Sequence, residues 1–362
     1  MPSNANPKRL AILDDYAEIA KPYFNHIPNL IIDSFPSTLN PFKPNDLEAL
    51  ITRLEPYDII STMRERTPFP STLQDRLPRL ELLLTTSTRN NAIDLPCATK
   101  RGVVVTGTQG DRPSETEQSA KLPDLPPPRG YSAVTQHSWA LLLALCSRVT
   151  VDDAALKNPE LATSWQSGAM VSLAGKTLGI VGLGKLGVGM AKIAILGFGM
   201  RVVAWSENLT STKARDVLAQ AGLPLESVQV VSKEALFRDA DVVSLHLVLS
   251  DRSRGIIGAR ELALMRSSAL LINTARSGLV DEDALIDVLK QGKIAGAALD
   301  VFSEEPLPSN SEWRRSSSWK SDVVLSPHMG YSNAGTLHRW YQEQADNVER
   351  WMRGDELLNR MN

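Results

Sequence analysis

Three short segments in the C-terminal half carry side chains suited to carbonyl chemistry. Arg276 lies in Asn-Thr-Ala-Arg-Ser-Gly, Glu305 in Ser-Glu-Glu-Pro, and His328 in Ser-Pro-His-Met-Gly. An arginine fork grips a carboxylate at two points and polarises the adjacent carbonyl. A histidine exchanges a proton near neutral pH, and a carboxylate beside it orients and stabilises the imidazolium. Taken singly, each has an ordinary alternative: a surface ion pair, a loop carboxylate, or a histidine beside a turn.

A glycine-rich turn precedes these segments. It reads Gly182-Leu-Gly184-Lys185-Leu186-Gly187, directly after an apolar run and at the start of a helical pattern. In such a turn the first glycine permits the tight bend, the second lets the backbone approach a pyrophosphate, and the third allows close packing of helix on strand. The spacing alone is a weak signal. With a second strand about 20 residues later, it predicts dinucleotide binding.

The end of that second strand bears on the choice of cofactor. An acidic residue normally holds the adenosine ribose hydroxyls there. Here Ser206 takes the expected acidic position and Glu207 follows it. The serine would admit a 2′-phosphate, whereas Glu207 would repel one. This favours NAD, with NADP as the alternative, although Glu207 also fits a solvated loop carboxylate.

These residues must be positioned by strands, and β-rich runs recur along the chain. Four lie in the first third (9–13, 57–62, 80–85 and 102–106), and seven follow position 176 (177–181, 200–205, 228–231, 241–245, 269–273, 294–300 and 323–325). Helical patterns lie between most of them, with an apolar helix at about 136–149 and an amphipathic one at about 333–353. This alternation predicts an α/β protein with doubly wound parallel sheets.

Length and composition limit the classes of protein. A chain of 362 residues favours two domains, and its net charge of −2 argues against a dedicated nucleic-acid binder. The first residues lack the apolar stretch of a signal peptide, so none is expected. No apolar run is long enough for a membrane span, and the spacing of the two cysteines predicts no disulfide framework. We therefore expect a cytoplasmic protein. Residues 111–131 are predicted to be a surface insertion and 303–322 a long polar loop.

The motifs around Arg276, Glu305 and His328, together with the glycine turn, resemble those of the D-isomer-specific 2-hydroxyacid dehydrogenases. The resemblance runs from about residue 8 to the end of the chain. It implies two Rossmann-like domains with a cleft between them. The substrate-binding domain would comprise 1–148 plus 332–362, and the dinucleotide-binding domain 149–331. The three side chains would be the catalytic set, with Glu305 rather than Glu304 in the catalytic position.

The same resemblance implies further contacts with the cofactor. Asp300 would help to seat the nicotinamide carboxamide, and the loop from His246 to Ser253 would pass over the cofactor. Besides the glycine turn, Ser206 and Glu207, the expected cofactor contacts are His246, Leu247, Ser253, Thr274, Ala275, Asp300 and Gly330. The other three histidines, His26, His137 and His338, are interpreted as structural or surface residues.

The substrate side departs from the family pattern. Arg64, Thr86 and Ser87 lie in two segments that resemble the family's substrate loops, and Arg66 and Arg89 stand nearby. Relatives have a glycine-rich second loop, so the extra side chains here prevent the substrate from being carried over. For Arg64 and Arg66, plain surface charge is an equal alternative.

The expected reaction is hydride transfer between NAD(P)H and a small-molecule 2-oxo acid or D-2-hydroxy acid. No nucleic-acid or membrane partner is expected, and the resemblance implies a homodimer. One alternative is an NADH-responsive scaffold of the corepressor type, which shares the fold. A second, an amino-acid dehydrogenase, would need a lysine in the cleft, and the three motifs contain none.

Overall fold

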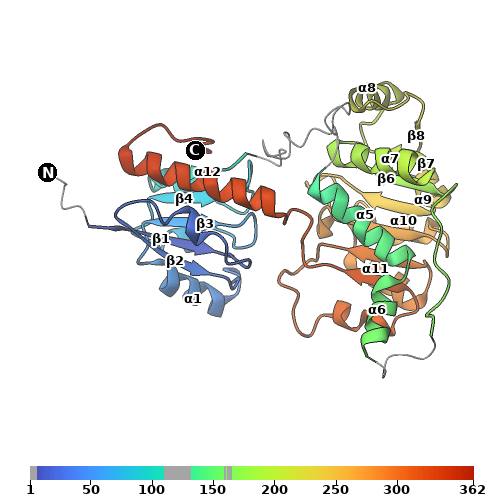
Figure 1. The fold of residues 1–362 in the computed structure, drawn as a ribbon, viewed down its shortest axis with the longest axis horizontal. Helices are drawn as coiled ribbons and strands as arrows, with labels where there is room; N and C mark the ends of the chain where they lie inside the picture. The colour runs from blue at the N-terminus through green and yellow to red at the C-terminus, as the bar shows by residue number, and fades with distance from the viewer. Residues whose placement is uncertain (1–5, 110–131, 159, 161–164) are drawn as a thin grey trace. The chain divides into compact units, whose positions relative to one another are not determined.

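The computed structural model describes residues 6–109, 132–158, 160 and 165–362. The chain divides into two compact units, Met1–Pro123 with Asn333–Asn362, and Asp124–Ser332. Each unit is an α/β layer structure built on one parallel sheet (Figure 1), which confirms the predicted fold class. The insertion predicted at 111–131 lies outside the described residues.

The first unit contains a five-stranded parallel sheet in the order β2-β1-β3-β4-β5. Its strands are β1 (Lys8–Leu13), β2 (Leu30–Phe35), β3 (Ile59–Thr62), β4 (Leu82–Thr85) and β5 (Val104–Thr106). Its helices are η1 (Lys21–Tyr23), α1 (Pro44–Leu54), α2 (Ser71–Gln74), α3 (Leu95–Lys100) and α12 (Ala334–Arg353). The four predicted strands are present. β2 was not predicted, because this edge strand is only partly buried and lacks a clear apolar pattern.

Successive side chains of a strand point to opposite faces of the sheet, and in this unit helices pack on both faces. Ala11, Leu13 and Ile60 point into an apolar core shared with α1, α2 and α3. Ser61, the neighbour of Ile60, therefore points to the opposite face, where its hydroxyl donates to Gln344 of α12 at 2.6 Å. The C-terminal helix thus completes the unit that the N-terminal strands begin.

The second unit contains a seven-stranded parallel sheet in the order β12-β11-β10-β9-β6-β7-β8. The strands are β6 (Thr177–Val181), β7 (Arg201–Trp205), β8 (Val228–Val230), β9 (Val242–Leu245), β10 (Leu270–Asn273), β11 (Gly296–Leu299) and β12 (Asp322–Leu325). The helices are α5 (Ala133–Cys146), α6 (Val149–Lys157), α7 (Lys185–Phe198), α8 (Ser211–Ala221), α9 (Lys233–Asp239), α10 (Ala259–Leu264) and α11 (Glu282–Gln291). All seven strands were predicted. Helix α5, whose residues the sequence placed with the first domain, packs against β10, β11, β12 and α7.

The segment 303–322 is not the plain polar loop that its serines suggested. It contains the 3-10 helix η4 (Glu312–Ser318) and the first residue of β12. Trp313 is only 2% exposed and contacts the rings of Phe302 and Trp319. The buried Trp313 anchors this segment to the second unit, and the polar residues around it concealed that anchor.

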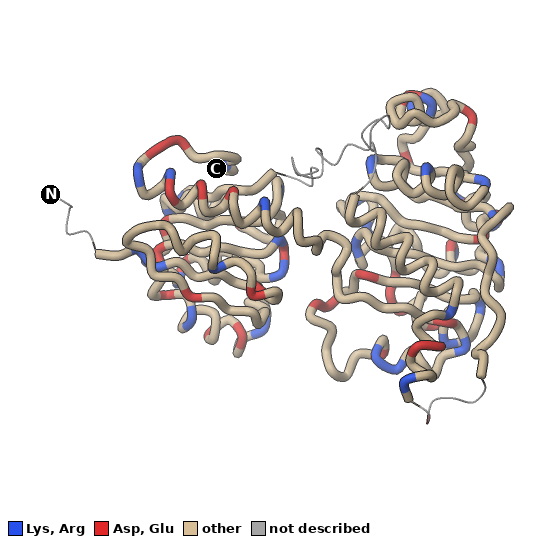
Figure 2. Tube along the Cα trace, viewed as in Figure 1, with Lys and Arg blue, Asp and Glu red and all other residues tan. Residues whose placement is uncertain are grey.

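Charged residues of both signs are distributed over the helices and loops of each unit, while the strands carry few (Figure 2). This mixing agrees with the small net charge and shows no stripe of a single sign among the described residues. Within the same residues, no helix is both long and apolar enough to cross a bilayer.

Candidate active site

Six strands of the larger sheet end at the same level. Leu325, Leu299, Asn273, Leu245, Val181 and Trp205 are successive register partners across β12, β11, β10, β9, β6 and β7. In a parallel sheet such a row brings the following loops to one edge, where open α/β sheets bind ligands. Every site residue predicted beyond position 181 follows one of these six ends.

The glycine turn has the geometry expected of a dinucleotide cradle. Gly182 has φ +104°, and a Cβ there would lie 2.9 Å from the backbone of His246. A Cβ on Gly187 would lie 2.2 Å from the carbonyl oxygen of Gly182. Gly184 caps α7, and a Cβ there would meet nothing within 4 Å. The turn is therefore tight on its protein side and open at the helix N-terminus, which suits a pyrophosphate.

Next to the turn, a half-buried Ser206 and an exposed Glu207 follow β7. His246 follows β9, and its Nε2 lies 2.8 Å from the Ser244 hydroxyl. Burial lowers the pKa of His246 to about 4, so the ring is neutral at physiological pH. Ser253 donates its hydroxyl to the carbonyl of Val248 at 2.7 Å, so it shapes its own loop.

Arg276 extends from a loop held by its neighbours. The Asn273 side chain accepts from the Ala275 N–H at 3.1 Å and donates to the Arg276 carbonyl at 3.0 Å. The buried Thr274 hydroxyl lies 2.6 Å from that of Ser138 on α5. Nη1 of Arg276 donates to the Ala275 carbonyl at 2.8 Å. The loop thus carries a guanidinium on a backbone fixed by short hydrogen bonds.

Glu305 and His328 come together although 23 positions separate them. Oε2 of Glu305 lies 2.6 Å from Nδ1 of His328, and Oε1 accepts from the Phe302 N–H at 2.9 Å. The carboxylate therefore fixes Nδ1 as the protonated nitrogen and leaves Nε2 for proton exchange. The ring stands edge-on to Tyr331 at 5.7 Å, and its side chain is 23% exposed. His328 adopts φ +56°, a conformation that non-glycine residues rarely take.

Asp300 lies in the middle of a network that the sequence did not predict. It is 1% exposed, and Nε2 of His137 lies 3.1 Å from its Oδ1 and 2.8 Å from the Ser326 hydroxyl. Burial raises the pKa of Asp300, but hydrogen bonds from His137, Ser326, Met329 and Gly330 outweigh it and lower the pKa below its usual value. His137 had been assigned to structure or surface. The available signal was that His137 and Ser138 lie in a polar run, 135–138, near the start of a helix whose later turns are apolar.

In the first unit, the two predicted substrate loops follow the neighbouring strands β3 and β4. The Arg64 N–H donates to the Thr86 hydroxyl at 3.0 Å, and Asn90 donates to the Arg64 carbonyl at 2.6 Å. The Ser87 hydroxyl donates to the Arg89 carbonyl at 2.6 Å. These polar side chains hold the two loops together, and Asn90, which the sequence did not single out, is central to this. Arg66 stacks on the Tyr16 ring at 4.5 Å.

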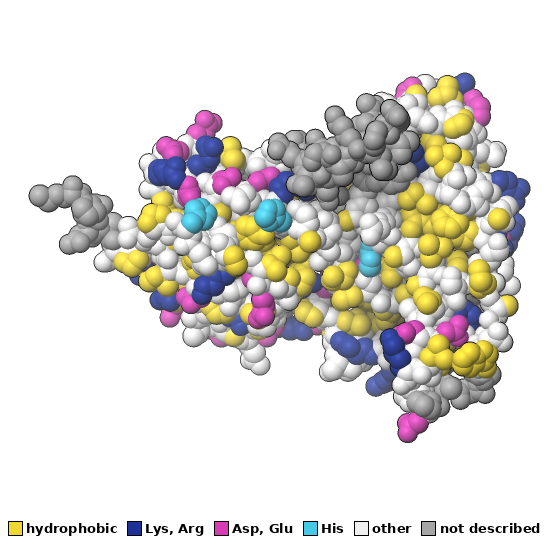
Figure 3. All heavy atoms as spheres, viewed as in Figure 1, with side chains coloured by type: hydrophobic (Ala, Val, Ile, Leu, Met, Phe, Trp, Pro, Cys, Tyr) yellow, Lys and Arg dark blue, Asp and Glu magenta, His cyan; other side chains and the backbone are white. Residues whose placement is uncertain are grey.

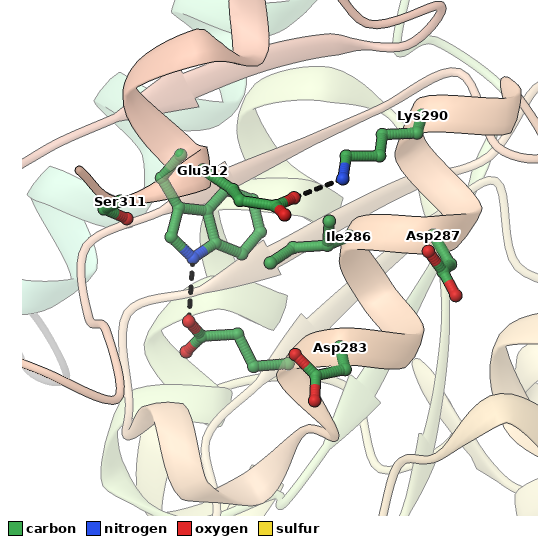
Figure 4. Close-up of a pocket in the computed structure, with 8 residues that line it drawn as sticks. Asp283, Ile286, Asp287, Lys290, Ser311 and Glu312 are labelled. Carbon is green, nitrogen blue, oxygen red and sulfur yellow. Dashed lines mark hydrogen bonds and ion pairs between the residues drawn. The ribbon is translucent and has the colours of Figure 1, made fainter.

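One pocket contains none of the predicted site residues. It lies between α11 and η4, where Lys290 pairs with Glu312 and the indole N–H of Trp313 donates to Glu282 at 2.9 Å (Figure 4). Asp283 and Asp287 line its other side. No described group of three or more His, Cys, Asp or Glu side chains is arranged to hold a metal ion.

Comparison with known proteins agrees with the strand-end motifs. Residues 139–330 match the model of the D-isomer-specific 2-hydroxyacid dehydrogenase NAD-binding domain. A glyoxylate reductase of Aeropyrum pernix is 35% identical over 85% of this chain and 86% of its own length. A hydroxypyruvate reductase of Blautia hydrogenotrophica is 26% identical over 85% of this chain and 86% of its own length. The crystal structure of a phosphoglycerate oxidoreductase from Vibrio cholerae has a TM-score of 0.78 and 30% sequence identity. The match covers 96% of this chain and 99% of that protein's chain. The chain therefore belongs to the D-isomer-specific 2-hydroxyacid dehydrogenase family.

Proposed function

We propose that this enzyme reduces a small 2-oxo acid to the D-2-hydroxy acid with NADH, with Arg276, Glu305 and His328 as its catalytic residues. The observation that carries the proposal is the Glu305–His328 pair of 2.6 Å on the same strand-end row as the glycine turn. Family membership supports the reaction class. The matched relatives are enzymes by name, so the corepressor-like alternative is not favoured.

The side chains divide the chemistry among them. Bound NADH supplies the hydride that the carbonyl carbon receives. His328, held through Nδ1 by Glu305, donates a proton from Nε2 to the carbonyl oxygen, and Glu305 stabilises the charged ring. The guanidinium of Arg276 binds the substrate carboxylate. In the direction of alcohol oxidation, a neutral His328 accepts the same proton.

The glycine geometry supports NAD binding by the second unit. The pyrophosphate would lie over Gly182, Gly184 and the first turn of α7, and the adenosine ribose would meet Ser206 and Glu207. Within that turn we propose backbone contacts from Lys185, Leu186 and Gly187. The exposed Glu207 carboxylate would repel a 2′-phosphate, so we propose a preference for NADH over NADPH.

We propose that the first unit supplies the remaining substrate contacts through Arg64, Thr86 and Ser87. Arg64 is 23% exposed at its side chain and lies over the Trp340 ring at 5.9 Å. Arg64 also pairs with Glu65 at 3.7 Å, and a guanidinium stacked on an aromatic ring can bind a carboxylate through its planar fork. The hydroxyls of Thr86 and Ser87 serve their own loops, so their contribution would come from the loop shape they impose.

A homodimer formed through the second unit is proposed from its exposed apolar side chains. Val149, Met170 and Leu196 are 53%, 68% and 66% exposed, and hydrophobic atoms gather around α5, α6 and α7 (Figure 3). An apolar face of this kind usually marks an interface. Sedimentation should show a dimer for the wild type and a monomer for Leu196→Glu with Met170→Glu. A monomeric wild type would refute this assembly.

A cytoplasmic location is proposed from the cysteines. Cys97 and Cys146 are both free thiols. Burial raises the pKa of Cys146 to about 11, which keeps that group in the unreactive thiol form. Two reduced cysteines suit a reducing compartment.

The test is a substrate panel with the purified protein. NADH and NADPH are offered in parallel against glyoxylate, hydroxypyruvate, pyruvate and bulkier 2-oxo acids, with the wild type and His328→Ala. We expect turnover with at least one acid, better with NADH. In His328→Ala turnover should fall by about 10²–10⁴-fold, while the Kd for NADH, from fluorescence titration, changes little. A near-normal rate in the variant would refute the role of His328.

A further inference from the structure

The first turns of α5 connect two strand-end loops that carry catalytic side chains. His137 reaches Asp300 and Ser326, beside the loop of His328. Ser138, the next residue, reaches Thr274, beside the loop of Arg276. Both contacts come from the polar run 135–138 of a helix whose later turns are apolar and which packs on β10, β11 and β12. Two polar side chains placed side by side in such a helix are costly to bury unless each is satisfied.

The bonds around Asp300 fix the role of His137. Ser326 Oγ donates to Oδ1 of Asp300 at 2.6 Å, so the same hydroxyl oxygen accepts from Nε2 of His137. His137 therefore carries its proton on Nε2 and donates to both groups. Oδ1 also accepts from the Met329 N–H at 2.8 Å, and Oδ2 from the Gly330 N–H at 2.9 Å. Four donors thus hold the carboxylate, three of them at Oδ1 and one at Oδ2.

These donors surround His328. Ser326 precedes it by two positions, and Met329 and Gly330 follow it directly. A Cβ on Gly330 would lie 3.2 Å from Oδ2 of Asp300 and 3.7 Å from the His137 ring, so the loop fits closely against both groups. His328 itself is held at φ +56°. Such a conformation persists only where the surroundings impose it, and Asp300 holds the chain on both sides, through the Ser326 hydroxyl before His328 and the backbone N–H groups of Met329 and Gly330 after it.

Ser138 makes the corresponding contact to the other loop. Its hydroxyl donates to the Val134 carbonyl at 2.8 Å, so in the 2.6 Å contact it accepts from the Thr274 hydroxyl. Thr274 and Ser138 are both fully or nearly buried. Two residues later the chain reaches Arg276.

We propose that His137 and Ser138 are positioning residues: through Asp300, His137 orients the proton donor His328, and through Thr274, Ser138 orients the carboxylate-binding Arg276. This rests on the roles proposed above for His328 and Arg276. It predicts that the two residues affect different kinetic constants: His137 affects kcat through the proton-transfer step, and Ser138 affects the KM for the 2-oxo acid. Neither residue touches the substrate.

The first test compares two substitutions of His137. His137→Leu removes the donor, and a displaced proton donor costs up to about 100-fold in kcat; the KM for NADH should change less than about twofold. His137→Gln keeps an N–H near the position of Nε2 and should recover at least about a third of kcat. Gln136→Ala, an exposed neighbour on the same helix, is the control. Equal losses in His137→Leu and His137→Gln, or no loss in either, would overturn the proposal.

The pH dependence supplies a readout that simple destabilisation would not change. Glu305 and Tyr331 face His328, and His137, Ser326 and two backbone N–H groups face Asp300. In His137→Leu the looser loop should weaken the contact with Glu305. The apparent pKa in the kcat profile should then differ from that of the wild type. An unchanged profile would count against the proposal.

The second test concerns Ser138. Ser138→Ala should raise the KM for the 2-oxo acid by about 10-fold with kcat within about twofold, because one hydrogen bond of the Arg276 loop is lost. Thr274→Val should reproduce this effect, and the double variant should be no worse than either single one. Additive losses, or a loss confined to kcat, would contradict the assignment.

An NMR titration separates this proposal from the proposed reaction. The imidazole signal of His328, assigned by its absence in His328→Asn, is followed against pH in the wild type, His137→Leu and Gln136→Ala. A wild type without turnover on any 2-oxo acid refutes the reaction, yet the His328 signal still reports its position. A shift of its pKa in His137→Leu alone supports the proposal, and identical curves in all three proteins refute it.

Discussion

The strand ends of the two sheets use polar residues differently. At the larger sheet, the ring of His328 makes a short contact with Glu305, and the loop that carries His328 is hydrogen-bonded to Asp300. At the smaller sheet, the hydroxyls of Thr86 and Ser87 turn inward to the loops themselves. The comparison teaches that a motif at a strand end can supply a reactive group or merely shape a loop. Hydrogen-bond partners, rather than residue types, distinguish the two.

Replacing Arg276 should produce the largest effect in this set. Arg276→Lys keeps the charge but loses the planar fork that grips a carboxylate at two points. We expect kcat/KM for the 2-oxo acid to fall by about 100-fold, mostly through KM. Arg260→Lys, at an exposed pair with Glu234, is the matched control and should leave kcat/KM unchanged. A fully active Arg276→Lys would mean that Arg276 only shapes its loop. Arg276 would then act like Thr86 and Ser87 at the smaller sheet, and the difference between the two sheets would not hold for it.

The glycine turn offers a test of binding against folding. Gly184→Ala adds a Cβ that meets nothing within 4 Å, so Tm should stay constant, while the Kd for NADH rises by about 10-fold as the backbone is kept from the pyrophosphate. Gly187→Ala should lower both Tm and affinity, because its Cβ would overlap the Gly182 carbonyl. Gly197→Ala, later in α7, is the control. If Gly184→Ala binds NADH normally, the proposed pyrophosphate position is incorrect.

The smaller sheet is tested through Thr86. Thr86→Val leaves the partly buried Arg64 N–H without its acceptor, which should lower the free energy of unfolding by about 1–2 kcal/mol. We expect kcat/KM to fall by less than about 10-fold, as measured beside a denaturation curve. A collapse of kcat/KM at unchanged stability would mean that Thr86 binds the substrate directly, as the family resemblance implies.

The smallest effect concerns stability against pH. His246 has a pKa of about 4 in the folded chain and near 6.5 when unfolded. Between these values the unfolded state binds more protons, so acidification from pH 6.5 to 4 should destabilise the wild type. His246→Gln should lose this part of the pH dependence, as seen in urea midpoints, whereas His338→Gln should retain it. Parallel curves for the wild type and His246→Gln would contradict the burial of His246.

The larger sheet could be predicted because most of its strands are compact apolar runs, and six of them are followed directly by site residues. The apolar runs, and the glycine, proline and polar residues that follow them, located β6 to β12 and the loops of Gly182, Arg276 and His328. The family and fold predictions were confirmed by the matched domain model and by the two parallel sheets.

The contacts that orient the motifs could not be predicted in the same way. His137 meets its partners 163 and 189 positions away, and no local pattern encodes such distances. Edge strand β2 was missed because it is only partly buried, and Trp313 was hidden in a serine-rich segment. Local periodicity reports what lies on an element, whereas long-range polar partners depend on how the elements meet.

The C-terminal segment, 333–362, belongs to the same unit as the N-terminal strands, and this has a consequence for how the protein folds during synthesis. Helix α12 packs on one face of the first sheet, where Gln344 meets Ser61 of β3, and the Met361 N–H donates to the carbonyl of Val105 in edge strand β5 at 2.8 Å. A ribosome therefore releases all of β6 to β12 before it delivers the helix that closes the earlier sheet. The second unit can fold during translation, while the N-terminal strands wait with one apolar side uncovered. Chaperone engagement should concentrate on that interval.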